Sequence, residues 1–440
     1  MDPLVGTLIL ILLALLGARF SFSTRRVREG PRLLFRTGTH FLLLGLLVGP
    51  VGLGILTPEA TRQLFPFLAL GLGWVGFHFG LQLDWDSLRR FPVGYHVLAA
   101  GQAVLAFLIV LAGGWLFFRA TGLSGEAPFH LVLLAAATAS VSTPAGIAMV
   151  SSNFLVRGNV RDLLLFTASL DAGVGFLALA VTYSLYRPEA LDAGLAMTPQ
   201  PALVAVTIGL GVVCGIVFAW LVRRRPAAEE LMLYILGICA FAAGVALQWG
   251  LSPLMVSVTM GAVVANMVPD RMRIMTVLQR WEKPVYLTFL LIAGALLSLP
   301  TVWIVVMAVG YTLLRAVAKG VGTATMVTLV PVGFDVPRRL GLGLLPQGGV
   351  SLAMAVSGAL LYSGVEVRGV DAESALFTVI VIGVLISEIT GPTFTVQLLR
   401  RAGEISPRVE EALAKGDERG AEREAIRHSQ APDRVTPEDG

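Results

Sequence analysis

Long apolar segments follow one another along nearly the whole of this 440-residue chain, and most are long enough to cross a lipid bilayer. A membrane-spanning helix needs about 20 apolar residues, because the hydrocarbon core offers no water to the backbone. Only 14% of the residues are charged, against about a quarter in a soluble protein. We therefore expect an all-α polytopic membrane protein with about thirteen transmembrane helices. The predicted helices cover residues 3–19, 38–57, 65–82, 94–118, 128–151, 162–184, 202–222, 231–248, 253–268, 284–300, 302–329, 339–362 and 372–398.

Basic residues are divided unequally between the two alternating sets of loops. One set, which includes Arg89 and Arg90, holds nineteen Lys and Arg residues, and the other set holds four. Loops rich in Lys and Arg remain in the cytoplasm. We therefore predict that the N-terminus is outside and the C-terminus inside a cell inner (cytoplasmic) membrane. In this interpretation the basic residues mark topology and do not bind nucleic acid.

The composition changes abruptly near residue 401. Residues 1–400 are expected to form the transmembrane domain. Residues 401–440 are rich in charge and lack aromatic residues, which predicts a flexible cytoplasmic tail. Cys214 and Cys239 lie in apolar segments and are expected to be thiols of the core. No span carries paired acids or another catalytic motif, so we expect no enzyme and no cofactor.

Two predicted spans are interrupted by polar residues and helix breakers. The fifth contains Thr138, Ser142 and Thr143 followed by Pro144, and the twelfth contains the run Pro346, Gln347, Gly348 and Gly349. Breaks at this depth free backbone carbonyls that must meet protein, water or an ion. The simpler alternative for the fifth span is a kinked helix whose hydroxyls bond to the preceding turn. One broken helix in each half of the chain is typical of transporters with inverted repeats, whose half-helix ends meet near the bilayer centre.

Four charged residues lie inside predicted spans, away from the span ends. Asp171 is the only charged residue between positions 163 and 183, and a carboxylate at the bilayer centre costs about 2.5–3.5 kcal/mol on insertion scales. Arg315 and Lys319 are four residues apart and share one helical face. Either cation can neutralise Asp171, as a structural salt bridge or as part of an ion-handling site. Glu388 lies in the last span and is expected to be hydrogen-bonded near the inner interface, with charge pairing in the same network as Arg315 as the alternative.

Several motifs in register resemble the monovalent cation:proton antiporter superfamily, and in particular its bacterial sodium/proton exchanger domain. The resemblance covers about residues 35–400. The matching segments, in order along the chain, are Gly45–Pro50, Gly54–Leu56, Gly80–Asp84, Leu88–Arg90, Ser142–Pro144, Leu163–Asp171, Arg315–Gly320 and Pro346–Gly348.

The resemblance implies a homodimer in which each chain has a dimerisation panel and a core domain. The fifth and twelfth spans would be the two broken helices that cross in that core. Related proteins usually carry two adjacent acidic or amide-and-acid residues in the sixth span. The second of these binds the ion and the proton, and the first often pairs with a lysine that Lys319 matches. This chain has only Asp171, followed by Ala172, and the spacing leaves open which of the two positions Asp171 takes.

These features lead to a hypothesis of electroneutral or weakly electrogenic exchange of Na⁺ or K⁺ for H⁺, with a role in pH homeostasis. Asp171 would bind the cation or a proton in competition, near Lys319. Thr138, Ser142 and Thr143 would offer oxygen atoms, which hard cations prefer. Two alternatives remain open at this point: a membrane sensor or scaffold that transports nothing, and a carrier of another substrate, such as an organic anion, on the same architecture.

Overall fold

The structure is a computed structural model that describes residues 38–121, 126–186, 199–297, 302–361, 366–367, 370–414 and 417–430. Over these residues the chain is helical apart from one short antiparallel pair, β1 (Glu366–Val367) and β2 (Val370–Asp371). Seven helices of this part of the chain are long and apolar enough to cross a membrane, and four shorter apolar helices accompany them. The predicted all-helical membrane class is therefore confirmed. The predicted helix at 3–19 lies outside the described residues.

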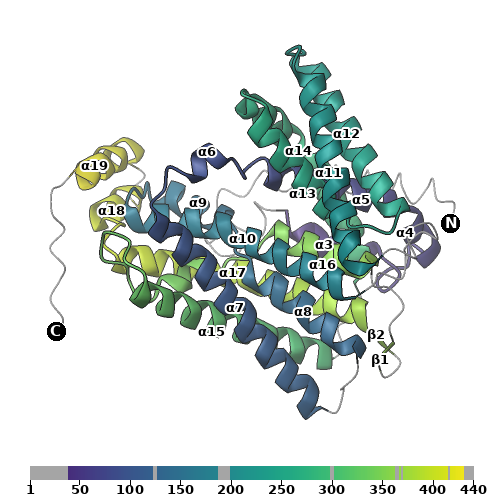
Figure 1. Cartoon of the computed structure of the whole chain (residues 1–440). Coiled ribbons are helices and arrows are strands. Elements are labelled where there is room, and N and C mark those ends of the chain that lie inside the picture. The colour runs from purple at the N-terminus through teal and green to yellow at the C-terminus, as the bar shows by residue number, and fades with distance from the viewer. Residues whose placement is uncertain are drawn as a thin grey trace.

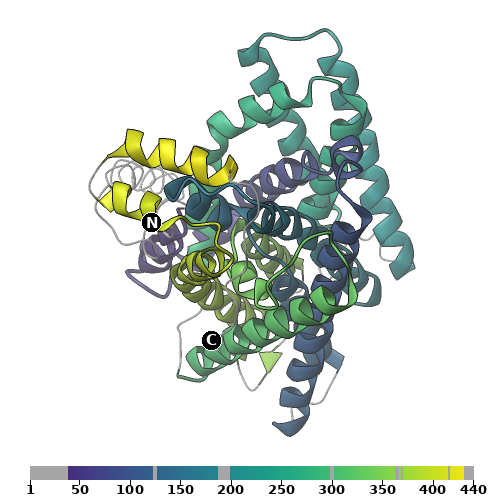
Figure 2. The ribbon, with the colours of Figure 1, turned by 90° about the vertical axis from the view of Figure 1, so that its left-hand side faces the viewer.

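The membrane helices form two bundles (Figures 1 and 2). The flanking bundle consists of α3 (His40–Val48), α5 (Phe65–Gly80), α11 (Gln200–Val222), α12 (Ala228–Gln248), α13 (Pro253–Met267) and α14 (Arg271–Ala295). The crossing bundle consists of α7 (Val93–Ala120), α8 (Glu126–Ser140), α9 (Pro144–Asn153), α10 (Asn159–Leu185), α15 (Val302–Leu329), the 3₁₀ helix η1 (Leu340–Leu344), α16 (Gly349–Leu361) and α17 (Ala372–Arg401). Both views show the teal α11 and α12 to one side of the blue α7 and the green α15.

Glycine residues let the helices of the flanking bundle approach closely. Gly45 of α3 faces Gly294 of α14, and Gly80 of α5 faces Gly261 of α13. A Cβ atom at any of these positions would overlap backbone atoms of the facing helix. Small residues are typical of helix contacts in lipid, where association depends on close packing because there is no hydrophobic force between helices.

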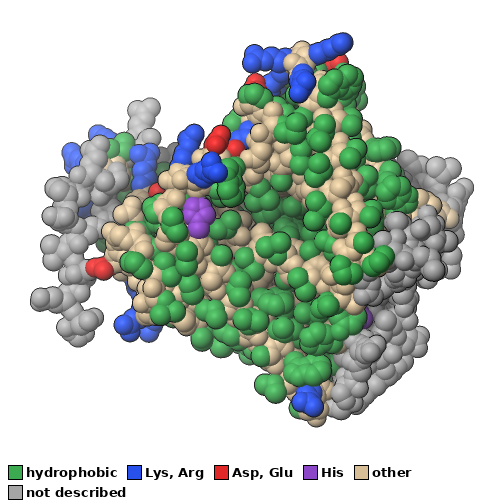
Figure 3. Space-filling view, viewed as in Figure 1, with side chains coloured by type: hydrophobic (Ala, Val, Ile, Leu, Met, Phe, Trp, Pro, Cys, Tyr) green, Lys and Arg blue, Asp and Glu red, His purple; other side chains and the backbone are tan. Residues whose placement is uncertain are grey.

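The molecular surface agrees with a bilayer as its surroundings. In Figure 3 hydrophobic side chains cover the middle of the visible face, and Lys and Arg side chains lie mainly at its upper and left edges. Arg223, Arg224 and Arg225 are exposed in the loop between α11 and α12. Large apolar side chains such as Leu177 and Trp220 are also exposed, on helices of spanning length. Such an apolar belt bounded by charges fits a multi-pass membrane protein.

Two predicted helices have different limits in the structure. The helix predicted at 38–57 ends at Val48, because Gly49 and Pro50 start a tight turn in which Gly54 has φ +64°. This part of the prediction was wrong. The helix predicted at 284–300 begins earlier, at Arg271, and contains Pro284. Its first half carries several charged residues, so hydropathy alone does not reveal it.

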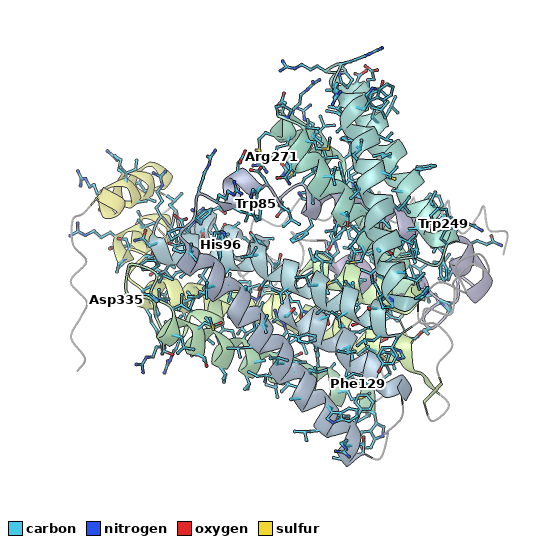
Figure 4. All side chains as sticks on the ribbon, viewed as in Figure 1. Trp85, His96, Phe129, Trp249, Arg271 and Asp335 are labelled. Carbon is cyan, nitrogen blue, oxygen red and sulfur yellow. The ribbon has the colours of Figure 1, made fainter. Side chains whose placement is uncertain are left out.

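An ion pair between Asp84 and Arg271 stabilises the loop that connects α5 and α7. Asp84 caps the short helix α6 (Trp85–Leu88), accepting from the Ser87 amide at 2.9 Å, and pairs with Arg271 at 2.7 Å. The hydrogen bond from the Ser87 side chain, helped by its amide and by Arg271, holds the pKa of Asp84 below its usual value. Figure 4 shows Arg271 beside Trp85 at this end of the molecule. A further short helix, α4 (Pro58–Gln63), precedes α5.

The segment after α17 contains two helices, α18 (Pro407–Ala414) and α19 (Glu418–Gln430). Val409, Ala421 and Ala425 of these helices pack around Leu155, in the loop between α9 and α10. The Glu404 carboxylate accepts hydrogen bonds from the amides of Val160 and Arg161, at 2.8 and 2.9 Å, in the first turn of α10. A carboxylate is favourable at this end of a helix. The flexible tail remains a prediction, and residues 431–440 lie outside the described part of the chain.

Candidate functional site

The first broken helix is interrupted between Ser140 and Pro144. α8 ends at Ser140, residues 141–143 are not helical, and α9 begins with Pro144 at its first position. Proline suits a helix start because it has no amide hydrogen to leave unpaired. Thr143 is the N-cap, and its hydroxyl accepts from the Ala145 amide at 3.4 Å. The predicted break is therefore a real interruption of the helix and more than a kink.

The second broken helix is interrupted between Leu344 and Gly349, and it contacts the first. η1 ends at Leu344 and α16 begins at Gly349, so Pro346, Gln347 and Gly348 lie in the non-helical link. The Thr143 amide donates to the Pro346 carbonyl at 3.0 Å. Gly348 lies against Thr143, and a Cβ atom there would be 2.8 Å from the Thr143 side chain. The backbones of the two breaks therefore touch, and Gly348 makes this approach possible.

Two further contacts fix the ends of this second break. The Ser142 hydroxyl donates to the Leu344 carbonyl at 2.8 Å, which ties the first break to the end of η1. At the other end, Gly349 lies against the hydroxyl of Tyr286 from α14, a helix of the flanking bundle. The start of α16 is thus in direct contact with the flanking bundle.

Arg315 joins the two breaks from α15. Its guanidinium donates to the carbonyls of Ala139 at 3.1 Å and Val141 at 2.8 Å in the first break. It also donates to Leu345 at 2.7 Å and, more weakly, to Leu344 at 3.4 Å in the second. The side chain is fully buried. Arg315 thus satisfies carbonyls that the interrupted helices leave free. The predicted cation on this helical face pairs chiefly with the backbone.

Asp171 and Lys319 form a buried ion pair beside these breaks. The Lys319 ammonium donates to the Asp171 carboxylate at 2.8 Å, and both side chains have no exposed surface. Lys319 also donates to the Ser140 carbonyl at 2.5 Å, at the end of α8. The second Asp171 oxygen accepts from the Ser142 amide at 3.1 Å, just before α9. Each charge therefore lies at the helix end of opposite partial charge, an arrangement that the helix dipoles favour.

Thr138 and Gln347 lie on another side of the crossing. The Gln347 amide donates to the Thr138 carbonyl at 2.8 Å and lies 3.2 Å from the Tyr311 hydroxyl. The Thr138 hydroxyl is also 3.2 Å from that hydroxyl, and Ser351 donates to the Thr138 carbonyl at 3.3 Å. The structure therefore brings Ser142 to Asp171, whereas Thr138 belongs to a polar cluster with Tyr311.

Glu388 is fully buried in α17 and interacts electrostatically with Tyr286 of α14. Nearby on α17, Gly391 packs against Pro346 in the second break. The predicted charge network is therefore divided. Asp171 and Lys319 form a direct pair, Arg315 binds carbonyls, and Glu388 lies toward the flanking bundle.

Sequence reasoning missed two polar residues of the site, Tyr311 and Gln102. Tyr311, Arg315 and Lys319 are spaced by four residues and so share one face of α15, a pattern visible in the sequence. Gln102 is buried in α7, and its side-chain oxygen lies 3.4 Å from the Lys319 ammonium. A lone amide in an otherwise apolar span was the signal that would have found it.

Two broken helices that meet inside a bundle, with buried charges at their ends, define a multi-pass membrane protein of the secondary-transporter class. The sequence profile described as "Sodium/hydrogen exchanger, transmembrane" matches residues 9–401. The chain therefore belongs to the sodium/hydrogen exchanger family.

Solved structures show the same fold. The sodium proton antiporter MjNhaP1 from Methanocaldococcus jannaschii, determined at pH 8, is similar with a TM-score of 0.62 and 17% sequence identity. The match covers 91% of this chain and all of that chain. A map of the same antiporter by electron microscopy matches with a TM-score of 0.60 and 16% identity, over 92% of this chain and all of that one. No functionally curated protein sequence matches the chain.

Proposed function

We propose that the chain is a secondary-active antiporter that exchanges Na⁺ or K⁺ for H⁺ by alternating access, with both ions competing for Asp171. The observation that carries this proposal is the fully buried pair of Asp171 and Lys319 beside the contact of the two broken helices. A buried carboxylate is costly unless a charge partner or an ion compensates it. A proton or a metal cation can take over that compensation when Lys319 moves away.

The groups around Asp171 suit a dehydrated cation. Ser142 is next to the carboxylate, and its hydroxyl oxygen keeps a free lone pair while donating to Leu344. Thr143 follows directly and presents a second hydroxyl. Hard cations prefer such oxygen ligands. We propose Asp171, Ser142 and Thr143 as the ligand set nearest the ion, with Thr138 contributing from the opposite side of the crossing.

The contact between Asp171 and Lys319 is relevant to the stoichiometry of exchange, that is, to the net charge moved in each transport cycle. In the resemblance described above, the lysine pairs with the first residue of the acidic pair. The 2.8 Å contact of Asp171 with Lys319 is the contact that the first position makes in related proteins, and it supports this position for Asp171. Ala172, which follows, has no group that binds an ion, so we propose that Asp171 also takes the ion-binding role of the second position. A single carboxylate that holds one Na⁺ or one H⁺ at a time gives a one-for-one exchange. We therefore propose electroneutral transport.

The proposal includes the wider architecture. We propose thirteen spans with inverted repeats, N-terminus outside and C-terminus inside a cell inner membrane, and a homodimer. Basic loops support this orientation, since Arg89 and Arg90 precede α7 and Arg157 precedes α10. During transport the crossing bundle would move against the flanking bundle, which exposes the site to each side in turn.

Reconstitution into liposomes with an internal pH dye tests the proposal. Addition of Na⁺, K⁺ or Li⁺ outside should change the internal pH for the wild type. Asp171→Asn, which keeps the shape and removes the charge, should reduce the rate at least tenfold, about the effect of 1.4 kcal/mol on a barrier. Asp84→Asn is the matched control, because it removes a carboxylate outside the crossing, and it should transport normally.

The same assay separates the alternatives. An undiminished cation response in Asp171→Asn would exclude competition at Asp171. A wild type that responds to none of the three cations would contradict antiport and favour a sensor or a carrier of another substrate. A pH response that generates a membrane potential would contradict the electroneutral stoichiometry alone.

A further inference from the structure

Three buried side chains around the Asp171–Lys319 pair have unused hydrogen-bonding atoms. These atoms are Nε2 of Gln102 and the hydroxyl oxygens of Thr167 and Thr323, and none has a partner within the described part of the chain. All three side chains are fully buried. Buried polar atoms in proteins are nearly always paired, so three exceptions around one ion pair require an explanation.

The three side chains lie next to the pair on three different helices. Gln102 of α7 is in contact with Lys319, at 3.4 Å. Thr323 follows Lys319 by one turn of α15, and the neighbouring Gly322 packs on the backbone of Gln102. Thr167 precedes Asp171 by one turn of α10, on the same helical face. Both members of the pair therefore have unused polar groups within one helical turn.

Ion exchange takes the carboxylate partner of Lys319 away, and the Gln102 oxygen lies where it can replace that partner. When Asp171 takes up a proton or a metal cation, the ammonium loses its carboxylate partner while it stays buried. The Ser140 carbonyl alone remains close, at 2.5 Å. The Gln102 oxygen is the next acceptor, and 3.4 Å is beyond the usual hydrogen-bond length, so a small movement of Lys319 would shorten and strengthen this contact.

We infer that Gln102 is a positioning residue for the exchange, which accepts the Lys319 ammonium whenever Asp171 is neutralised. This inference rests on the proposed function, because neutralisation of Asp171 is the step it serves. When a proton neutralises Asp171, this proton comes from water and binds an Asp171 oxygen, and Lys319 keeps its own three protons. In that state the Thr323 hydroxyl would accept from the free Gln102 Nε2 and so hold the amide oxygen toward Lys319. The Thr167 hydroxyl would donate to the vacated Asp171 oxygen.

Other charged or titratable groups near the pair are already engaged. Arg315 shares the α15 face and is bound to four carbonyls, and Tyr311 is bonded within the Thr138 cluster. Glu388 of α17 lies toward Tyr286 of the flanking bundle. On α7, Tyr95 and His96 pack on Phe166, about two turns from Gln102.

Two substitutions of Gln102 with opposite expectations test the inference. Gln102→Met keeps the length and removes the acceptor, so the neutral form of Asp171 is disfavoured and proton uptake needs a lower pH. The pH of half-maximal exchange should fall by about one unit. Gln102→Glu adds a carboxylate that attracts Lys319 away from Asp171 and repels the negative form of Asp171. The same midpoint should rise by about one unit.

The matched control is Ser257→Ala. Ser257 is also fully buried with an unpartnered hydroxyl among the described residues, but it lies in α13 of the flanking bundle. This variant should keep the wild-type pH profile. Replacing an unpaired buried polar group by an apolar one of similar shape is nearly neutral for folding. A merely structural Gln102 would behave like Ser257, and coincident profiles for both Gln102 variants and the wild type would overturn the inference.

A second measurement separates this inference from the proposed function. The melting temperature of the purified protein, followed against pH, reports proton binding without any transport. Opposite shifts of its pH midpoint in Gln102→Met and Gln102→Glu would support the positioning role even in a protein that exchanges no cation. Unshifted midpoints in both variants would overturn the role even if the wild type is an antiporter. If Gln102→Met does not fold, Gln102→Glu and Gln102→Asn carry the same test.

Discussion

The flanking bundle and the crossing bundle are held together in different ways. In the flanking bundle, glycines such as Gly80 and Gly261 bring helix backbones into contact, and the core is filled by side chains such as Trp74 and Phe218. In the crossing bundle, the backbone is interrupted and the charges of Arg315, Lys319 and Asp171 fill the space. One bundle depends on the fit of uncharged surfaces, and the other on charges that satisfy free backbone groups.

The two bundles therefore differ in how their stability is distributed over their residues. Close backbone packing has many contacts of similar strength and tolerates one change at modest cost. A buried charge that bonds several carbonyls concentrates the cost in one side chain, because its removal leaves all of its partners unsatisfied. Stability in lipid is thus widely distributed in the flanking bundle. In the crossing bundle it depends on a few residues, and two of them, Asp171 and Lys319, are also proposed to take part in ion exchange.

The largest effect is expected for Arg315→Met. The substitution keeps most of the apolar volume but removes the donors to carbonyls of both breaks. Each carbonyl left without a partner should cost about 1–3 kcal/mol, so the total loss in the free energy of unfolding should exceed that of a single hydrogen bond severalfold. Thermal melting in detergent, followed by tryptophan fluorescence, measures the loss. Arg315→Lys keeps the charge but lacks the planar fork of donors, so its melting temperature should lie between those of the wild type and Arg315→Met. A melting temperature equal to that of the wild type would show that Arg315 does not hold the breaks together.

A smaller effect is expected for Gly261→Leu in the flanking bundle. The new side chain would force α13 away from the α5 backbone, and overpacking of this kind costs about 1–3 kcal/mol. Gly237→Leu is the matched control, because Gly237 lies exposed on α12 with open space around it, and it should leave melting unchanged. The contrast between the bundles would be broken if Gly261→Leu were more damaging than Arg315→Met under the same conditions.

The smallest effect is expected for Asp84→Asn, outside both bundles. Its contact with Arg271 is near the surface, and asparagine still caps a helix, so the loss at neutral pH should be below about 1 kcal/mol. Because the folded protein holds the pKa of Asp84 below its usual 3.8, this contribution is present above that pH and disappears as the pH falls further. Wild type and variant should therefore differ near pH 7 and converge near about pH 3. Asp86→Asn in the same short helix is the control.

The sequence predicted the parts of the site that depend on local rules. Pro144 cannot lie in the interior of a helix without disturbing it, and Pro346 together with two glycines strongly disfavours a continuous helix, so both interruptions were predictable. Asp171 and Lys319 were also predictable, because an unpaired charge in a span is costly. Their mutual contact was one of two pairings considered, and the structure selected Lys319 over Arg315.

The parts that the sequence did not predict depend on contacts between distant segments. The carbonyls bound by Arg315 come from residues 139, 141, 344 and 345, and nothing in any one segment indicates that they converge. The length of α14 was missed because charged residues before Pro284 conceal a helix from hydropathy. The contact of Thr138 with Tyr311 was also missed, because a hydroxyl in a span has several possible partners and only the fold shows which one it meets.

Glu404 has a mechanical consequence for the ion-handling helix. Its carboxylate binds the first amides of α10, the helix that carries Asp171, while its own backbone directly follows α17. Glu404 therefore connects the end of α17 to the start of α10. A displacement of α18 or α19, by a binding protein or by the surface of the membrane, would reach α10 through Glu404 and through the packing on Leu155. The charged segment after α17 is thus attached to the bundle that we propose to move during transport.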